Sequence, residues 1–273
     1  MKLNKLSLTV LTLGFAFLYL PIVLLIGYSF NESRLVTVWA GFSTKWYGEL
    51  FADDQMMSAV WLSLKIAMGA STGAIILGTL AAFALVRFGR FWGHTLFGSM
   101  INAPLVMPDV ITGLSLLLLF VAMGQLFGWP AERGSLTILL AHITFCTAYA
   151  AIVISSRLKE MDLSLEEAAM DLGAHPFKVF WLVTLPIIAP SLVAGWLLSF
   201  TLSMDDLVIA SFVSGPGSTT LPMVVFSSVR LGVSPKINAL ATLIVLVVSI
   251  AVCVAWWFAR KAERDAQMLP DEE

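Results

Sequence analysis

The charged residues of this chain are unevenly distributed, and this distribution constrains the fold more than any other feature. Six long apolar stretches contain only four of the 16 basic and 18 acidic residues. A membrane-crossing helix needs about 20 mostly apolar residues, and every stretch reaches that length. The stretches are residues 7–30, 58–86, 95–123, 135–155, 191–213 and 238–258. The pattern predicts an all-α membrane protein with six transmembrane helices, largely surrounded by membrane lipid.

Composition supports this fold class and excludes several others. The chain is 59% hydrophobic and 12% charged, whereas soluble domains carry about 25% charged residues. The formal net charge of −2 argues against a nucleic-acid partner. Cys146 and Cys253 lie in apolar runs, so neither a disulfide framework nor a metal site is predicted.

The basic residues predict the orientation. With six spans both chain ends share one side of the membrane, and ten basic residues fall on that side against five on the other. Because cytoplasmic loops are enriched in lysine and arginine, we expect both termini in the cytoplasm. We find no internal repeat, so a single membrane domain over residues 1–273 is expected, with residues 156–190 as its largest cytoplasmic segment.

The segment 156–190 has the pattern of a helical hairpin. Ser164 and Glu167 fit a capping box at the start of a helix over 165–172. Gly173 then stands where a helix commonly ends in a left-handed residue. Pro176 suits the first turn of a second short helix, which we expect over 177–184.

Charge and size distinguish the two faces of this hairpin. Glu166, Glu167 and Asp171 make the first helix acidic, which disfavours an anionic membrane surface. Ala168 and Ala169 leave one side narrow enough to enter a groove. A protein partner with a basic groove is therefore favoured over an amphipathic connector that lies on the bilayer. Pro186 and Pro190 are expected to interrupt the helix before the fifth span.

The stretch from Glu167 to Pro186 resembles the EAA loop of ABC-importer permeases. That family pattern is E-A-A, three residues, G, nine residues and I-x-L-P, and only the isoleucine is replaced, by Val183. The resemblance implies a type I importer fold, a second permease subunit, and two copies of a cytoplasmic ATPase. The residues it assigns to ATPase coupling are Glu167, Ala168, Ala169, Asp171 and Gly173. The chain has no phosphate-binding loop motif, so we expect ATP and Mg²⁺ on the partner ATPase and no cofactor on this chain.

Further segments resemble polyamine permeases, most closely those of the putrescine type. They are residues 35–50, 103–120, 203–223 and 234–243. This resemblance implies uptake of putrescine, and of spermidine as an alternative, across a bacterial inner membrane with a periplasmic polyamine-binding protein.

Two other functions compete with this interpretation. A self-sufficient proton-coupled carrier for an organic cation would use Asp109 and Asp206 as a relay. A membrane enzyme is the weakest alternative, because no metal cluster, nucleophile–base motif or phosphate loop is visible. We therefore predict no catalytic residues.

Three of the four charged residues within the spans are carboxylates, Asp109, Asp205 and Asp206. An ionised group at the bilayer centre costs roughly 2.5–3.5 kcal/mol, so an acidic interior indicates a route or gate for a cation. We predict that Asp206 faces this pathway, because it continues a small and polar helical stripe through Ser199 and Ser203. Asp205, about 100° away on a helix, would then contact another subunit.

Other polar residues of the spans have open alternatives. Asp109 either contacts substrate or stabilises the positive end of a half-helix begun by Pro108. Lys65 is expected to extend towards the membrane interface, and His142 to form a hydrogen bond between helices. The turn at 214–217 is a bare turn, an outer gate or a contact for the binding protein.

Overall fold

The structure, a computed structural model, describes residues 4–35, 38–232 and 234–267. Regular secondary structure in these ranges is helical, with one isolated bridge between Asn31 and Phe42. Among the described residues, six helices are long and apolar enough to cross a membrane. The all-α class with six spans is thus confirmed, while the cytoplasmic location of the termini stays a prediction.

The chain divides into two compact units, residues 1–57 with 225–273, and residues 58–224. The single membrane domain expected over residues 1–273 stays a prediction. Residues 1–3, 36–37, 233 and 268–273 of that predicted domain lie outside the described residues.

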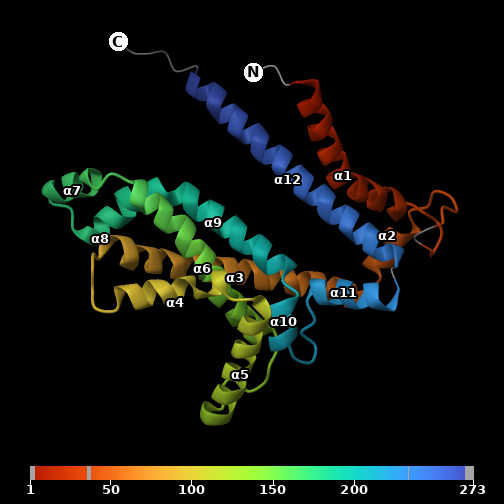
Figure 1. The fold of residues 1–273 in the computed structure, drawn as a ribbon, viewed down its shortest axis with the longest axis horizontal. Helices are drawn as coiled ribbons and strands as arrows, with labels where there is room; N and C mark the ends of the chain where they lie inside the picture. The colour runs from red at the N-terminus through yellow and green to blue at the C-terminus, as the bar shows by residue number, and fades with distance from the viewer. Residues whose placement is uncertain (1–3, 36–37, 233, 268–273) are drawn as a thin grey trace. The chain divides into compact units, whose positions relative to one another are not determined.

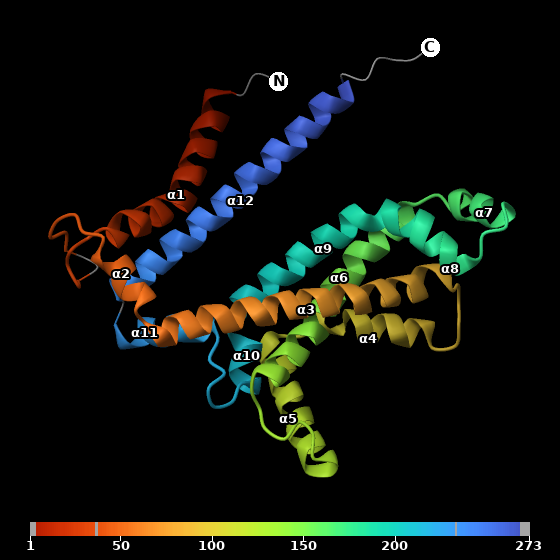
Figure 2. The same cartoon turned by 180° about the vertical axis from the view of Figure 1, so that it is seen from behind.

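The first unit is built on α1 (Lys5–Ser29), α2 (Lys45–Phe51) and α12 (Pro235–Gln267). The long helix α12 packs against both α1 and α2, and Figures 1 and 2 show α1 and α12 side by side. In the loop that follows α1, the backbone carbonyl of the buried Asn31 accepts a hydrogen bond of 2.6 Å from the indole N–H of Trp46.

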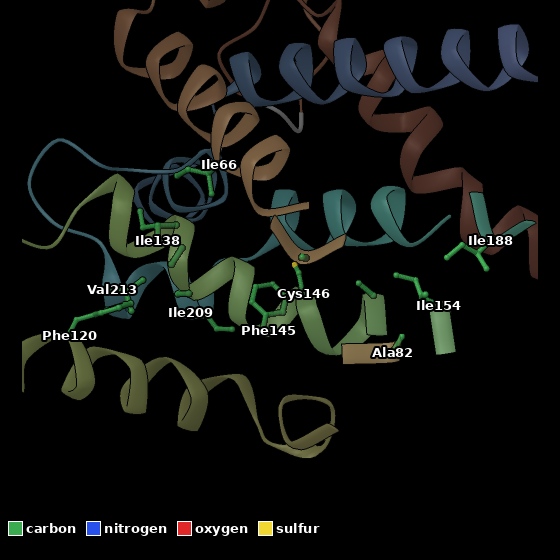
Figure 3. Close-up of a cluster of buried hydrophobic side chains, with 14 of the residues drawn as sticks. Ile66, Ala82, Phe120, Ile138, Phe145, Cys146, Ile154, Ile188, Ile209 and Val213 are labelled. Carbon is green, nitrogen blue, oxygen red and sulfur yellow. The ribbon is translucent and has the colours of Figure 1, made fainter. Parts of the chain in front are cut away.

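The second unit contains the remaining helices and is centred on α6. Its helices are α3 (Asp54–Arg87), α4 (His94–Val106), α5 (Asp109–Phe127), α6 (Ser135–Glu160), α7 (Ser164–Asp171), α8 (Pro176–Val179), α9 (Leu185–Asp205), α10 (Val208–Val213) and α11 (Leu221–Leu231). Helix α3 begins four residues before this unit, and α11 ends beyond it. The core is formed by α6 together with α3, α5, α9 and α10, and Figure 3 shows Ile138, Cys146 and Ile154 of α6 within it.

Small residues let the core helices approach closely. A Cβ atom added at Gly78 of α3 would lie 2.8 Å from the Cβ atom of Ala150 and 3.0 Å from the backbone nitrogen of Ala151. No side chain fits at that distance, so glycine is needed where α3 crosses α6. This is the packing expected between membrane helices, which associate through small residues because lipid provides no hydrophobic driving force.

The predicted third span, 95–123, is divided into two helices. Helix α4 ends at Val106 and α5 begins at Asp109, with Met107 and Pro108 extended between them. Proline has no backbone N–H and disfavours the helical conformation in the residue before it. Of the two pieces, only α5 is long enough to be a candidate span.

The predicted fifth span, 191–213, also differs from the structure. The candidate span covers Pro176–Asp205, and the chain breaks at Asp206 and Leu207 before α10. The expected interruptions at Pro186 and Pro190 are absent. A π-helical turn over Phe180–Thr184 leads directly into α9, where Pro186 is the second residue and Pro190 lies within the helix.

Candidate functional site

The three predicted carboxylates lie where helices begin or end. Asp109 is the first residue of α5, Asp205 is the last residue of α9, and Asp206 lies in the break before α10. Helix α10, which follows Asp205 and Asp206, packs against α5, which begins at Asp109. The structure therefore brings together helix ends that carry three carboxylates, which the sequence places on two separate spans.

A close approach between α5 and α10 supports this cluster. A Cβ atom at Gly113, one turn after Asp109, would lie 2.7 Å from the ring of Phe212 and 3.3 Å from Cα of Ile209. A larger residue at this position would separate the two helices. Gly113 thus keeps the start of α5 near the start of α10.

Asp206 is held inside the protein and is not part of a helix. Its Oδ2 accepts the N–H of Ala210 at 2.8 Å, and its Oδ1 accepts the N–H of Ile209 at 3.2 Å. These bonds satisfy two amides at the start of α10, which have no partner within that helix. Nε2 of His142 lies 3.2 Å from the same Oδ2 atom, and only 8% of the Asp206 side chain is exposed.

The polar stripe predicted for the fifth span is confirmed only in part. Ser199 and Ser203 of α9 are buried, as expected for a face turned towards other helices. The stripe does not continue as a helix through Asp206, because α9 ends at Asp205. Helix periodicity therefore does not predict the direction of the Asp206 side chain. Asp205 and Asp109 are exposed in the structure.

The structure also places the other polar residues of the spans. Pro108 is the N-cap of α5 and Asp109 lies in its first turn. This is the geometry expected if Asp109 stabilises the positive end of a half-helix that begins at Pro108. The ammonium of Lys65 lies 5.2 Å from the ring centre of Trp61, one turn nearer the start of α3. His142 forms the expected interhelical hydrogen bond, with 2.7 Å between its Nδ1 and Oγ of Ser203.

The predicted helical hairpin is present, but its cap differs from the prediction. Helix α7 begins at Ser164 itself, so Ser164 does not cap it. The backbone N–H of Ser164 instead donates to Oδ1 of Asp162 at 3.0 Å. The amide and hydroxyl of Ser164 lower the pKa of the exposed Asp162 carboxyl below 3.8. Gly173 has the expected left-handed backbone, with φ of +84°.

The acidic face of α7 is smaller than the sequence suggests, because Glu166 points inward. Its Oε2 lies 3.2 Å from Nε of Arg87, and its Oε1 accepts the hydroxyl hydrogen of Thr184 at 2.7 Å. The side chains of Arg87 and Glu166 are only 11% and 13% exposed. Glu167 and Asp171, in contrast, are exposed.

Arg87 is a functional candidate that sequence reasoning missed. It is the last residue of α3, and in the sequence it is one of the ten basic residues that predict the orientation. It lines a cavity of about 320 Å³ beside the hairpin, together with Phe83, Glu166, Glu167 and Phe180. The available signal was an arginine that directly follows a long apolar run, although its partner was not evident from the sequence.

Comparison with known proteins identifies the family. Residues 74–265 match the model of the family described as "Binding-protein-dependent transport system inner membrane component". The chain belongs to this family. The matched range contains the hairpin and all three carboxylates. As a family member, the chain is a multi-pass inner-membrane permease subunit, and it is not itself an enzyme.

Two relatives match almost the whole chain. The chain is 69% identical over 255 residues to "Putrescine transport system permease protein PotI" of Escherichia coli (strain K12), covering 93% of this chain and 91% of the relative. It is 44% identical over 245 residues to "Spermidine/putrescine transport system permease protein PotC" of the same strain, covering 90% of each.

Solved structures of two transporters share the fold. A chain of a bacterial ABC transporter that imports the polysaccharide alginate aligns with a TM-score of 0.71 and 18% identity, covering 94% of both chains. A chain of the MetNI methionine ABC transporter aligns with a TM-score of 0.56 and 18% identity, covering 77% of this chain and 95% of that one. These similarities confirm the importer permease fold.

Proposed function

We propose that this chain is the permease subunit of an ATP-driven polyamine importer, with putrescine as its main substrate. The observation that carries the proposal is the 69% identity to a putrescine permease protein over 93% of the chain. The identity to a spermidine/putrescine permease protein is lower, at 44%. Putrescine is therefore favoured over spermidine as the transported amine.

The carboxylate cluster suits such a substrate chemically. A diamine carries two ammonium groups on a short methylene chain, and its passage through a low-dielectric interior needs compensating negative charge. In our proposal the exposed Asp109 and Asp205 contact the ammonium groups in turn. For Asp205 this role replaces the expected contact with another subunit. The buried Asp206 belongs to the gate, because it holds the break between α9 and α10. No metal takes part.

The hairpin is proposed to couple this chain to a cytoplasmic ATPase. The exposed residues Glu167, Ala168, Asp171 and Gly173, together with the half-buried Ala169, form its outer surface. An acidic helix with small side chains suits a cleft with basic walls. We assign ATP and Mg²⁺ to two copies of that ATPase, so that this chain binds no cofactor of its own.

The remaining partners complete the proposed complex. A second permease subunit would form a heterodimer with this chain and supply the other half of the pathway. A periplasmic polyamine-binding protein would deliver the substrate. This arrangement requires the hairpin and both chain termini in the cytoplasm, as the positive-inside rule predicts, and treats residues 1–273 as one transmembrane permease domain.

Movement of the hairpin has two direct routes into the membrane helices. Along the chain, α8 and the π-helical turn lead without interruption into α9. Through side chains, Glu166 joins α7 to the end of α3 and to Thr184 in the π-helical turn. Closure of the ATPases would thus shift α3 and α9 together, and α9 ends at the carboxylate cluster.

Transport by the reconstituted complex tests this function. The chain would be co-purified with its partner subunits, reconstituted into liposomes and supplied with the binding protein, ATP and radiolabelled putrescine. We expect uptake that needs ATP, is blocked by vanadate and is weakly inhibited by unlabelled spermidine. Uptake by this chain alone, driven by a proton gradient without ATP, would contradict the proposal and support the proton-coupled carrier.

A further inference from the structure

His142 lies at the centre of a buried network that joins three segments of the second unit. It belongs to α6, and only 1% of it is exposed. Its Nδ1 lies 2.7 Å from Oγ of Ser203 on α9, and its Nε2 lies 3.2 Å from Oδ2 of Asp206 in the break before α10. The ring of Phe145, one turn away, packs edge-on against the imidazole.

The contact with Asp206 indicates which imidazole nitrogen carries a hydrogen. An ionised Asp206 can only accept hydrogen bonds, so Nε2 must be the donor to it. Nδ1 is then free to accept the hydroxyl hydrogen of Ser203. A neutral imidazole with hydrogen on Nε2 therefore satisfies both contacts, which suits a site that excludes water.

The bond from His142 affects more than one pair of residues. Oδ2 of Asp206 accepts both the Nε2–H of His142 and the backbone N–H of Ala210. The imidazole therefore fixes the carboxylate in the rotamer that reaches the first turn of α10. Because α10 packs against α5, the position of α10 also determines the surroundings of Asp109.

We propose that His142 is a positioning residue for transport: its Nε2–H holds Asp206 at the start of α10 and keeps the α9–α10 break in shape. Without this bond, Asp206 loses one partner in a buried site, and α10 loses a firmly held cap. His142 does not itself contact the substrate. This inference rests on the proposed function for its transport readout.

Two amide variants distinguish the two nitrogens of His142. The terminal nitrogen of His142→Gln reaches approximately the position of Nε2, so it can still donate to Asp206. The shorter side chain of His142→Asn reaches only the position of Nδ1 and leaves Asp206 without that donor. Thr144→Ala is the matched control, because Thr144 is an exposed α6 residue whose hydroxyl donates to the carbonyl of Leu140 in the same helix.

Two measurements on the purified full complex test the proposal. Amide hydrogen exchange of peptides covering 206–213 reports the α10 cap, and putrescine uptake at sub-saturating substrate reports function. We expect His142→Asn to lower uptake about tenfold, as for loss of a hydrogen bond to a charged group, and to accelerate exchange. We expect His142→Gln and Thr144→Ala to stay within about threefold of the unmodified complex.

The outcomes separate this inference from the proposed function. Equal behaviour of the Gln and Asn variants, or unchanged exchange in His142→Asn, would overturn the positioning role. If the unmodified complex takes up no putrescine, the proposed function fails. The exchange measurement still decides the role of His142 in that case, because it needs no substrate.

Discussion

Nε of Arg87 lies 3.2 Å from Oε2 of Glu166, which joins the last residue of α3 to the first turn of α7. Both side chains are almost completely buried, so the pair is not an ordinary surface salt bridge of little energetic value. It places a long membrane helix in direct contact with the segment proposed to bind the ATPase.

Glu166 and Glu167 should have different roles although they are neighbours on α7. Glu166→Ala leaves Arg87 buried without a partner, and breaking a buried ion pair in this way costs about 3 kcal/mol. We expect a lower melting temperature of the purified complex and easier proteolysis within 162–184. Glu167→Ala should leave melting unchanged but weaken the association of the ATPase, because Glu167 is exposed.

Charge exchange provides the control for this pair. The double variant Arg87→Glu with Glu166→Arg should recover part of the melting temperature that either single variant loses. Equal destabilisation by Glu166→Ala and Glu167→Ala would contradict the inward orientation of Glu166.

Gly173 should be needed for its backbone conformation rather than for its small size. Its φ is +84°, and no atom lies within 4 Å of a Cβ atom built there. A β-branched residue in this conformation costs roughly 1–2 kcal/mol, so Gly173→Val should reduce ATP-coupled putrescine uptake several-fold. Asparagine tolerates the left-handed region better, and Gly173→Asn should retain more uptake. Equal uptake by the two variants would show that the left-handed turn is not required.

Asp206→Asn should impair uptake while the complex still assembles. The amide oxygen can still accept one N–H at the start of α10, so the fold persists, but the negative charge of the gate is lost. We expect at least a tenfold fall in putrescine uptake, since an ionic hydrogen bond contributes about 1.5–3 kcal/mol. Co-purification of the partner subunits is the assembly control. Normal uptake by this variant would remove Asp206 from the transport mechanism.

The pair of Asp53 and Lys236 should make the first unit sensitive to acid. The N–H of Met56 and the ammonium of Lys236, 3.2 Å away, hold the pKa of Asp53 below its ordinary value of 3.8. A carboxyl with a lowered folded-state pKa stabilises the fold above its unfolded-state pKa, and this contribution is lost as the pH falls through the folded value. Asp53→Asn should therefore reduce the melting temperature at pH 7 and have little effect near pH 3.

Melting curves of the purified complex at both pH values check this prediction. Lys236→Met is the partner control, and it should also have its larger effect at pH 7. A constant difference between Asp53→Asn and the unmodified protein across this range would contradict a lowered pKa for Asp53.

The local pattern of the chain predicted its elements well where neighbouring residues decide the conformation. The left-handed conformation of Gly173 follows from its position directly after the first helix of the hairpin. The start of α5 at Asp109, one of the two alternatives for that residue, depends on the adjacent proline. The capping box at Ser164 was wrong because Asp162, two residues earlier, accepts its N–H and starts the helix one residue sooner.

The sequence predicted which carboxylates belong to the candidate site, but not the contacts that hold them. Helix periodicity continued through Asp206 predicts that this side chain faces the pathway. In the structure the helix ends at Asp205, and the carboxylate of Asp206 contacts His142, which lies more than 60 residues earlier in the chain. The pairing of Arg87 with Glu166 likewise joins distant segments, so no local periodicity could reveal either contact.

The sequence by itself determined that this chain crosses a membrane, because charged groups are costly in lipid and their scarcity in six long apolar stretches is visible from residue order alone. It also determined the hairpin and its family resemblance. Only the tertiary structure decided which carboxylates are exposed and which is buried. That choice depends on hydrogen bonds from His142, Ile209 and Ala210 to Asp206, and such bonds exist only after the helices have packed.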